Sequence, residues 1–99
     1  MINEFVEKNG ELYINGKKVL KAWESFTGWY WFGVEKCDCG IPTCDRWFGL
    51  VQGFEEEWGY FSENELKALG KSYRVWEIPK KDLIYSGRRG LSNPQTARR

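Results

Sequence analysis

Residues 46–69, RWFGLVQGFEEEWGYFSENELKAL, decide the fold of this chain. The aromatic and aliphatic run at their start is typical of a buried β-strand, and glycines within such a run mark a bulge or a close approach. Three consecutive glutamates, Glu55 to Glu57, then indicate a solvated turn, after which WGYF predicts a short partner strand. This stretch therefore predicts an antiparallel pair of strands that leads directly into a helix.

The end of the same stretch carries the start signals of that helix. Ser62 and Glu65 are the first and last residues of a capping box, in which the serine accepts from the third helical amide and the glutamate reaches back. Two leucines then form a short apolar stripe, and Gly70 suits the position just after a helix. We therefore expect a helix of about two turns over residues 63–69.

Upstream of this stretch the chain has further strand signals. Asn15-Gly16, between ELYI and KKVLKAW, predicts a two-residue hairpin, because both residue types tolerate a positive φ. Alternation along the second of these strands places Val19 and Trp23 on a common side. GWYWFGVEK then predicts a central strand, in which Trp29 and Trp31 point to one face and the intervening residues to the other.

Downstream of the helix, SYRVWEIP alternates as a strand and DLIYS is expected to add an edge strand. We therefore predict a single α+β domain over residues 1–87, with a cysteine loop at 37–45. Its mostly antiparallel sheet has roughly five or six strands, stays open or curls strongly, and carries one short helix on one face. Residues 88–99 have neither periodicity nor bulk, so we expect a flexible basic tail with Arg88, Arg89, Arg98 and Arg99.

Composition and charge narrow the function classes. Ninety-nine residues form one domain, and a net charge of +1 argues against a strongly basic nucleic-acid-binding protein. Residues 1–87 hold eleven Lys/Arg and all fourteen Asp/Glu, a balance of −3, while the tail carries +4. No apolar run reaches the length of a membrane span, and the N-terminus lacks a signal-peptide core. We therefore expect a cytoplasmic protein with no membrane partner.

The cysteine loop is the chemically suggestive feature. Cys37, Cys39 and Cys44 form a C-x-C-x4-C pattern, and such thiolates can converge on one Zn²⁺, which prefers four ligands. Because the chain has no histidine, the fourth ligand would be Asp38, Asp45 or Glu35, a water, or a residue of a second molecule. Asp38 and Asp45 are the best candidates. Two alternatives stay open: a disulfide from Cys44 to one of the other two cysteines, and three free thiols.

A catalytic role for these thiols lacks support in the sequence. A nucleophilic cysteine needs a base or another source of a lowered pKa. The usual base, histidine, is missing, and Lys36 and Arg46 offer only help through space. We therefore predict that the protein is not an enzyme, and an enzyme of unknown type is the last alternative.

The segment FGLVQGFEEEWGYFSENEL, preceded by WYWFGVE and followed by VWEIPKKDLIY, resembles a family of short proteins of unknown function. Members occur in bacteria, archaea and their plasmids, and share a pattern near W-Y-x-x-E, F-G-x-V-x-G-x-E-x-E-x-G-Y-F-S-x-x-E-L and D-L-x-F. The match runs from Gly28 to about Tyr85 and implies an α+β domain associated with mobile genetic elements. It implies no catalytic residues, and the cysteine loop departs from the pattern.

The predicted function is a small non-catalytic binding module that acts through an aromatic face of its sheet. One short helix covers only one face, so the other face either closes on itself or presents aromatic side chains to a partner. We expect that partner to be a protein, either a different one or a second copy of this chain. The candidate surface residues are Trp29, Trp31, Trp47 and Trp58.

The alternative function is nucleic-acid binding. Bases stack on exposed aromatic side chains, and the arginines of the tail would supply phosphate contacts. Phosphate contacts dominate the affinity of such complexes, so the net negative charge of residues 1–87 counts against this alternative.

Overall fold

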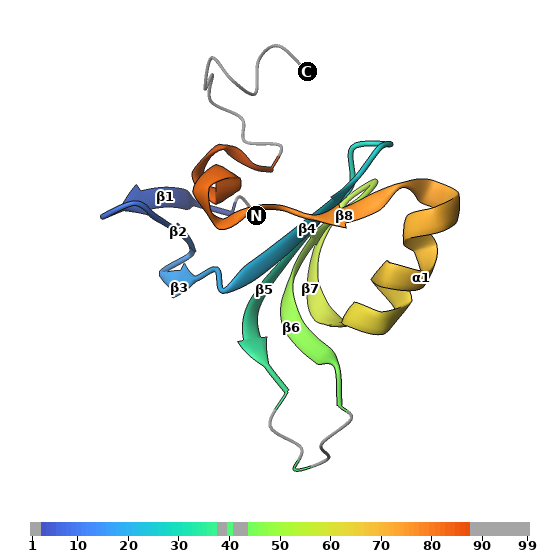
Figure 1. The fold of residues 1–99 in the computed structure, drawn as a ribbon. Coiled ribbons are helices and arrows are strands. Elements are labelled where there is room, and N and C mark those ends of the chain that lie inside the picture. The colour runs from blue at the N-terminus through green and yellow to red at the C-terminus, as the bar shows by residue number, and fades with distance from the viewer. Residues whose placement is uncertain (1–2, 38–39, 41–43, 88–99) are drawn as a thin grey trace.

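The computed structural model describes residues 3–37, 40 and 44–87. In these residues the chain forms two antiparallel sheets, one α-helix and one 3-10 helix, which confirms the α+β prediction (Figure 1). The smaller sheet has the order β1-β2-β3, and the larger, open sheet has the order β7-β6-β5-β4-β8. The elements are β1 (Phe5–Lys8), β2 (Glu11–Ile14), β3 (Lys17–Lys18), β4 (Lys21–Ser25), β5 (Tyr30–Lys36), β6 (Arg46–Gln52), β7 (Glu56–Ser62), α1 (Glu63–Tyr73), β8 (Val75–Glu77) and η1 (Lys80–Tyr85).

The predicted Asn15-Gly16 hairpin is confirmed, but the strand after it is shorter than expected. Asn15 and Gly16 both have positive φ, +53° and +82°, and join β2 to β3. The Val19 amide still donates to β2, whereas the Leu20 amide donates to Gly33 of β5. The chain thus changes sheets within one residue. Val19 consequently packs in a different core from Trp23, so the predicted common side was wrong.

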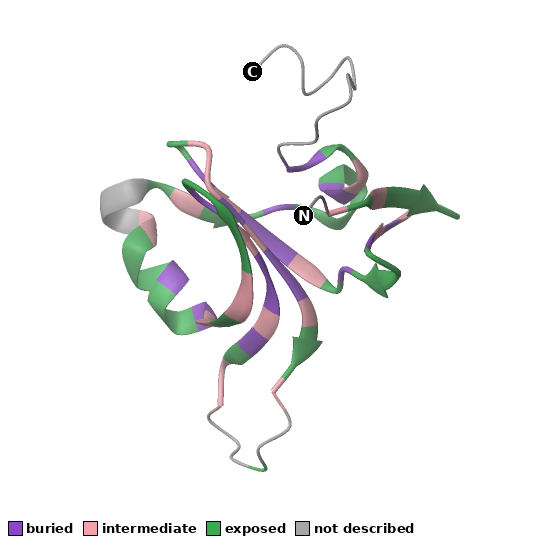
Figure 2. Ribbon diagram, turned by 180° about the vertical axis from the view of Figure 1, so that it is seen from behind, coloured by how far each residue is buried: buried purple, intermediate pink, exposed green. Residues whose placement is uncertain are grey.

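Both faces of the larger sheet are covered, which corrects the expectation that one helix leaves a face bare. α1 lies on one face, and the smaller sheet together with η1 lies on the other (Figures 1 and 2). The segment DLIYS, predicted as an edge strand, instead forms most of η1, with Ser86 as the residue that caps its end. The core on the η1 side consists of Leu12, Ile14, Val19, Ala22, Tyr30, Phe32, Leu50, Ile78 and Leu83, and the core under α1 of Trp23, Trp47 and Leu66.

Strands β5 and β6 approach each other at two facing glycines. A Cβ added at Gly49 would lie 1.7 Å from the backbone oxygen of Phe32. One added at Gly33 would lie 2.7 Å from the ring of Trp47, and the register shifts between Gly33 and Glu35. A side chain at Gly49 would therefore push the two strands apart, and one at Gly33 would displace the Trp47 ring. Glycine within a strand often permits such a close approach.

Helix α1 begins where the sequence predicts but ends later. It starts after Ser62, as expected, and runs to Tyr73, so Gly70 lies inside it. The helix stops at Arg74, which takes the left-handed conformation with φ +52°. Gly70 instead serves packing, because a Cβ there would lie 3.0 Å from the Val75 carbonyl oxygen. The prediction that Gly70 terminates the helix was therefore wrong.

The start of α1 is capped from two directions. The Ser62 hydroxyl accepts from the Glu65 amide at 3.2 Å, as the capping box predicts. The same hydroxyl donates to Asp45 Oδ2 at 2.5 Å, and the Asn64 amide donates to that oxygen at 2.6 Å. The Asp45 carbonyl also accepts from the Glu63 amide. The last residue of the cysteine loop thus holds the first turn of the helix.

Replacing Ser62 by alanine removes one helix-cap acceptor and one donor to Asp45. We expect the free energy of unfolding to fall by on the order of 1 kcal/mol. Urea denaturation measures the change. Asn64→Ala is the matched control, because Asn64 is exposed and bonds Asp45 through its backbone amide, which the substitution keeps. Equal stability of the Ser62→Ala and control proteins would contradict the capping role.

Candidate functional site

The aromatic side chains at one end of the larger sheet form the main candidate site. The turn between β4 and β5 and the turn between β6 and β7 lie at this end, opposite the cysteine loop (Figure 1). The rings of Trp29 and Trp31 are 6.0 Å apart, and Phe54 meets Trp29 edge-on at 5.4 Å. We call Trp29, Trp31 and Phe54 the aromatic end. Phe54 is 93% exposed, and the two tryptophans are half-buried.

The tight turn at Gly53 builds this arrangement. The Trp29 ring lies against the backbone of Gly53, where an added Cβ would come within 2.3 Å of it. The Gly53 amide donates to the Glu55 carbonyl, which closes the turn and projects Phe54 outward. A cavity of about 240 Å³ results, and it is lined by Trp29, Val51, Gly53, Phe54, Glu55 and Glu57. The lining of this cavity thus combines two aromatic residues, Trp29 and Phe54, with two acidic residues, Glu55 and Glu57.

The structure divides the four predicted surface tryptophans between different environments. Trp29 and Trp31 belong to the aromatic end. Trp47 is only 7% exposed, because α1 covers it, so its prediction as a surface residue was wrong. Trp58 is half-buried on the opposite face of the sheet, where it stacks on Phe48 and donates its indole N–H to Asn3. The four side chains therefore do not form one surface.

Glu63, a buried carboxylate in the first turn of α1, had no recognisable signal in the sequence. Its Oε1 accepts from the indole N–H of Trp47 at 3.0 Å. Its Oε2 lies 3.2 Å from Lys21 and 3.2 Å from Lys67. Burial acts to raise the pKa of Glu63, but these three hydrogen bonds outweigh it and hold the pKa below its ordinary value. A carboxylate so fully paired is suited to holding the helix on the sheet.

Glu63→Gln tests this network through pH. Because the pKa of Glu63 is lowered in the folded state, its contribution to stability is full above the ordinary value of 4.5 and is lost as pH falls below it. We expect the variant to lose about 1 kcal/mol at neutral pH and to unfold with a flatter pH dependence below pH 5. Thermal melts from pH 7 to pH 3 measure this. The exposed Glu65→Gln control should keep the original pH dependence.

The described part of the cysteine loop neither holds nor excludes a metal site. Cys37 and Cys44 are half-buried, and no disulfide joins them to each other. Asp38 and Cys39 lie outside the described residues, as do the tail arginines. Among the residues that the structure describes, no three Cys, Asp or Glu side chains gather closely enough to hold a metal ion. The zinc hypothesis therefore stays a prediction.

Asp45, one of the two carboxylates predicted as zinc ligands, caps the start of α1. Hydrogen bonds from the Ser62 hydroxyl and the Asn64 amide lower the pKa of its carboxyl group. Its Oδ2 is thus already engaged by two donors in the helix cap. A zinc ion would have to compete with these two donors for the Asp45 carboxylate.

Elemental analysis of protein purified without added metal or chelator tests the zinc hypothesis. If Cys37, Cys39 and Cys44 bind the ion, we expect about one zinc per chain, lost together with stability in Cys39→Ser. Asp38→Asn should weaken binding more than Asp45→Asn at equal helix stability. Protein without zinc, in which the thiols titrate freely or one remains beside a disulfide, would contradict the hypothesis.

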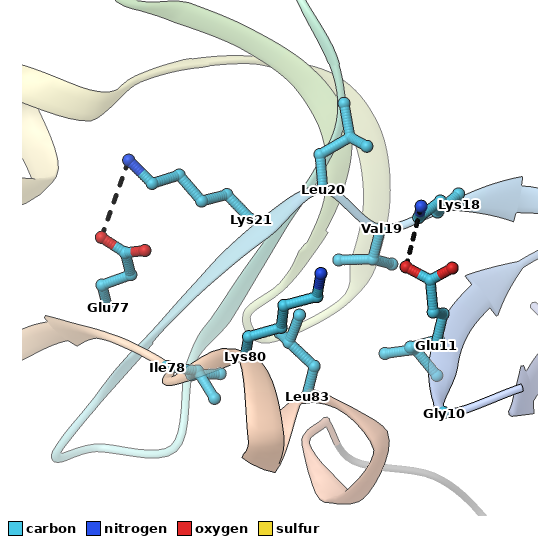
Figure 3. A pocket seen from close by; sticks show the side chains of 11 residues that line it. Gly10, Glu11, Lys18, Val19, Leu20, Lys21, Glu77, Ile78, Lys80 and Leu83 are labelled. Carbon is cyan, nitrogen blue, oxygen red and sulfur yellow. Dashed lines mark ion pairs between the residues drawn. The ribbon is translucent and has the colours of Figure 1, made fainter.

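A second concave site lies where the two sheets and η1 meet (Figure 3). This cavity of about 350 Å³ has an apolar floor that includes Val19, Ile78 and Leu83. Charged side chains surround it: Lys18 pairs with Glu11 at 2.8 Å, Lys21 lies 3.7 Å from Glu77, and Lys80 adds a third ammonium group (Figure 3). Because the lining comes from three segments that lie far apart in the sequence, no local pattern indicates this cavity. Its lysines and glutamates largely neutralise one another.

Comparison with known proteins identifies no relative of this chain. No family model matches the chain, and neither a curated protein nor a solved structure matches it. Within the described residues, no helix is both long enough and apolar enough to cross a membrane. The function must therefore be argued from the geometry of the sites.

Proposed function

We propose that the protein is a small non-catalytic binding module whose contact surface is the aromatic end of the larger sheet. The exposure of Phe54 carries this proposal. Burying a phenylalanine side chain is worth roughly 1.5–3 kcal/mol, so a ring left 93% exposed forgoes most of that gain. Its contact with Trp29 holds the ring in place at the tip of a short turn. Aromatic anchors held in this way are typical of the residues that dominate binding energy at interfaces.

The charges beside the aromatic end favour a protein partner. Glu55 and Glu57 line the same cavity as Trp29 and Phe54. Two carboxylates at this position would repel the phosphates of a nucleic acid, although bases can stack on the rings. A basic segment of a protein suits both features, because cations are attracted to aromatic faces and to carboxylates. Nucleic-acid binding is thus the less favoured alternative.

The arrangement of the acidic side chains supports a non-catalytic function. Asp45 caps a helix, and Glu63 is held by Trp47 and two lysines. Both carboxylates are thereby committed to structural bonds. The association with a mobile genetic element rests on the sequence resemblance alone, and the genes beside this one would test it.

Site-specific crosslinking tests the binding function. Benzoylphenylalanine at position 54 replaces the exposed ring by a photoreactive one, and the same residue at the exposed Lys81 is the control. In cells that contain the protein, we expect one discrete protein, or a second copy, to crosslink from position 54 but not from 81. With that partner purified, Phe54→Ala should weaken binding by about 30-fold, the effect of a typical hot spot.

Two results would contradict the proposed function. One is equal crosslinking from positions 54 and 81, because the aromatic end would then be an ordinary surface. The other is oligonucleotide binding that depends on Phe54 and weakens steeply with salt, which would favour the nucleic-acid alternative.

A further inference from the structure

The C-terminal segment, residues 88–99, begins close to Glu55, Glu56 and Glu57, which we call the glutamate turn. Gly87, the last described residue, is buried, and a Cβ there would lie 3.3 Å from Gln52 Oε1. The Gln52 amide group in turn donates to Glu56 Oε2 at 2.8 Å. Only the Gln52 side chain therefore lies between Gly87, where the segment begins, and Glu56. Twelve residues follow Gly87, and in an extended state they span at most about 40 Å. The segment can thus reach every part of this end of the sheet.

The glutamate turn has a negative charge that the described residues do not compensate. Glu55, Glu56 and Glu57 are all exposed. The ion pairs within the described residues involve other glutamates, namely Glu11, Glu63 and Glu77. Residues 1–87 have a balance of −3, whereas residues 88–99 contain four arginines and no acidic residue. Charge complementarity therefore favours the C-terminal segment as the occupant of this surface.

The cavity beside Phe54 has the chemistry that binds a guanidinium group. Arginine is flat and weakly hydrated, so it stacks on aromatic rings and pairs with carboxylates through two parallel hydrogen bonds. Trp29 and Phe54 supply the rings, and Glu55 and Glu57 supply the carboxylates. The same chain already shows one such contact at this end of the sheet, where the guanidinium of Arg74 lies 5.7 Å from the Phe26 ring.

We propose that arginine side chains of residues 88–99 bind this cavity and the glutamate turn of the same chain. The segment then competes with the partner for the aromatic end, a consequence that rests on the proposed function. Surface ion pairs and exposed cation–π contacts are individually weak and are screened by salt. The contact is therefore reversible, and a partner with a better basic anchor displaces the segment.

The test uses the purified full-length chain, with benzoylphenylalanine at position 54 and no partner present. After irradiation of dilute protein, mass spectrometry should find a link from position 54 to residues 88–99 within single chains. Arg→Gln substitution at all four tail arginines should abolish most of this link, as should the paired Glu55→Gln and Glu57→Gln substitutions. About 1 M NaCl, where the Debye length is about 3 Å, should have the same effect.

A matched control removes four positive charges elsewhere. Lys8, Lys17, Lys80 and Lys81 are exposed, and their substitution by glutamine should leave the link unchanged. Folding of each variant is checked by its indole N–H resonances. A link that joins position 54 only to other parts of the body, or only to a second copy, would overturn the proposal. Since no partner is present, that outcome leaves the proposed binding function to its own test.

Discussion

The seating of α1 on the larger sheet is the constraint on which the rest of the structure depends. Two carboxylates fix it: Asp45 holds the first turn from the cysteine loop, and Glu63 reaches down to Trp47 and Lys21. Under the helix, Trp23 and Trp47 are buried together with Leu66. Trp31 packs against this core but is only partly buried, and Trp29 and Phe54 continue the row of aromatic rings from it. The position of one short helix thus decides which tryptophans are fully buried.

The second face shows how a small chain covers both sides of its sheet. The change of strand partner at Leu20 folds the N-terminal hairpin over the η1 side, where Leu12 and Ile14 are fully buried. η1 closes the remaining gap with Leu83, and Gly87 then packs against Phe32. This second layer places the chain's exit beside the β6–β7 turn. Its effect is to bring Gly87, after which the basic segment begins, close to Gln52 and the acidic turn.

The sequence predicted the features that depend on neighbouring residues and missed those that depend on distant ones. The Ser62 cap and the Asn15-Gly16 turn were found because their signals lie within four residues. The helix end was missed because Gly70 lies inside the helix, where the Val75 carbonyl oxygen of β8 approaches it closely. Trp47 and Trp31 share a sheet face, so only the three-dimensional seating of α1 distinguishes the buried one. The role of Asp45 was likewise hidden, since its partners lie seventeen and nineteen residues away.

The glutamate turn also has a consequence for the solubility of the protein. Strand β7 is at the edge of its sheet, and in the described part of the chain it pairs on one side only, with β6. A seven-residue edge with an exposed Tyr60 is a template onto which another molecule can add a strand. Glu56 and Glu57 open this strand with two exposed charges, so a second copy that paired there in parallel and in register would bring like charges together. These glutamates thus disfavour the parallel, in-register stacking of strands that is found in fibrils.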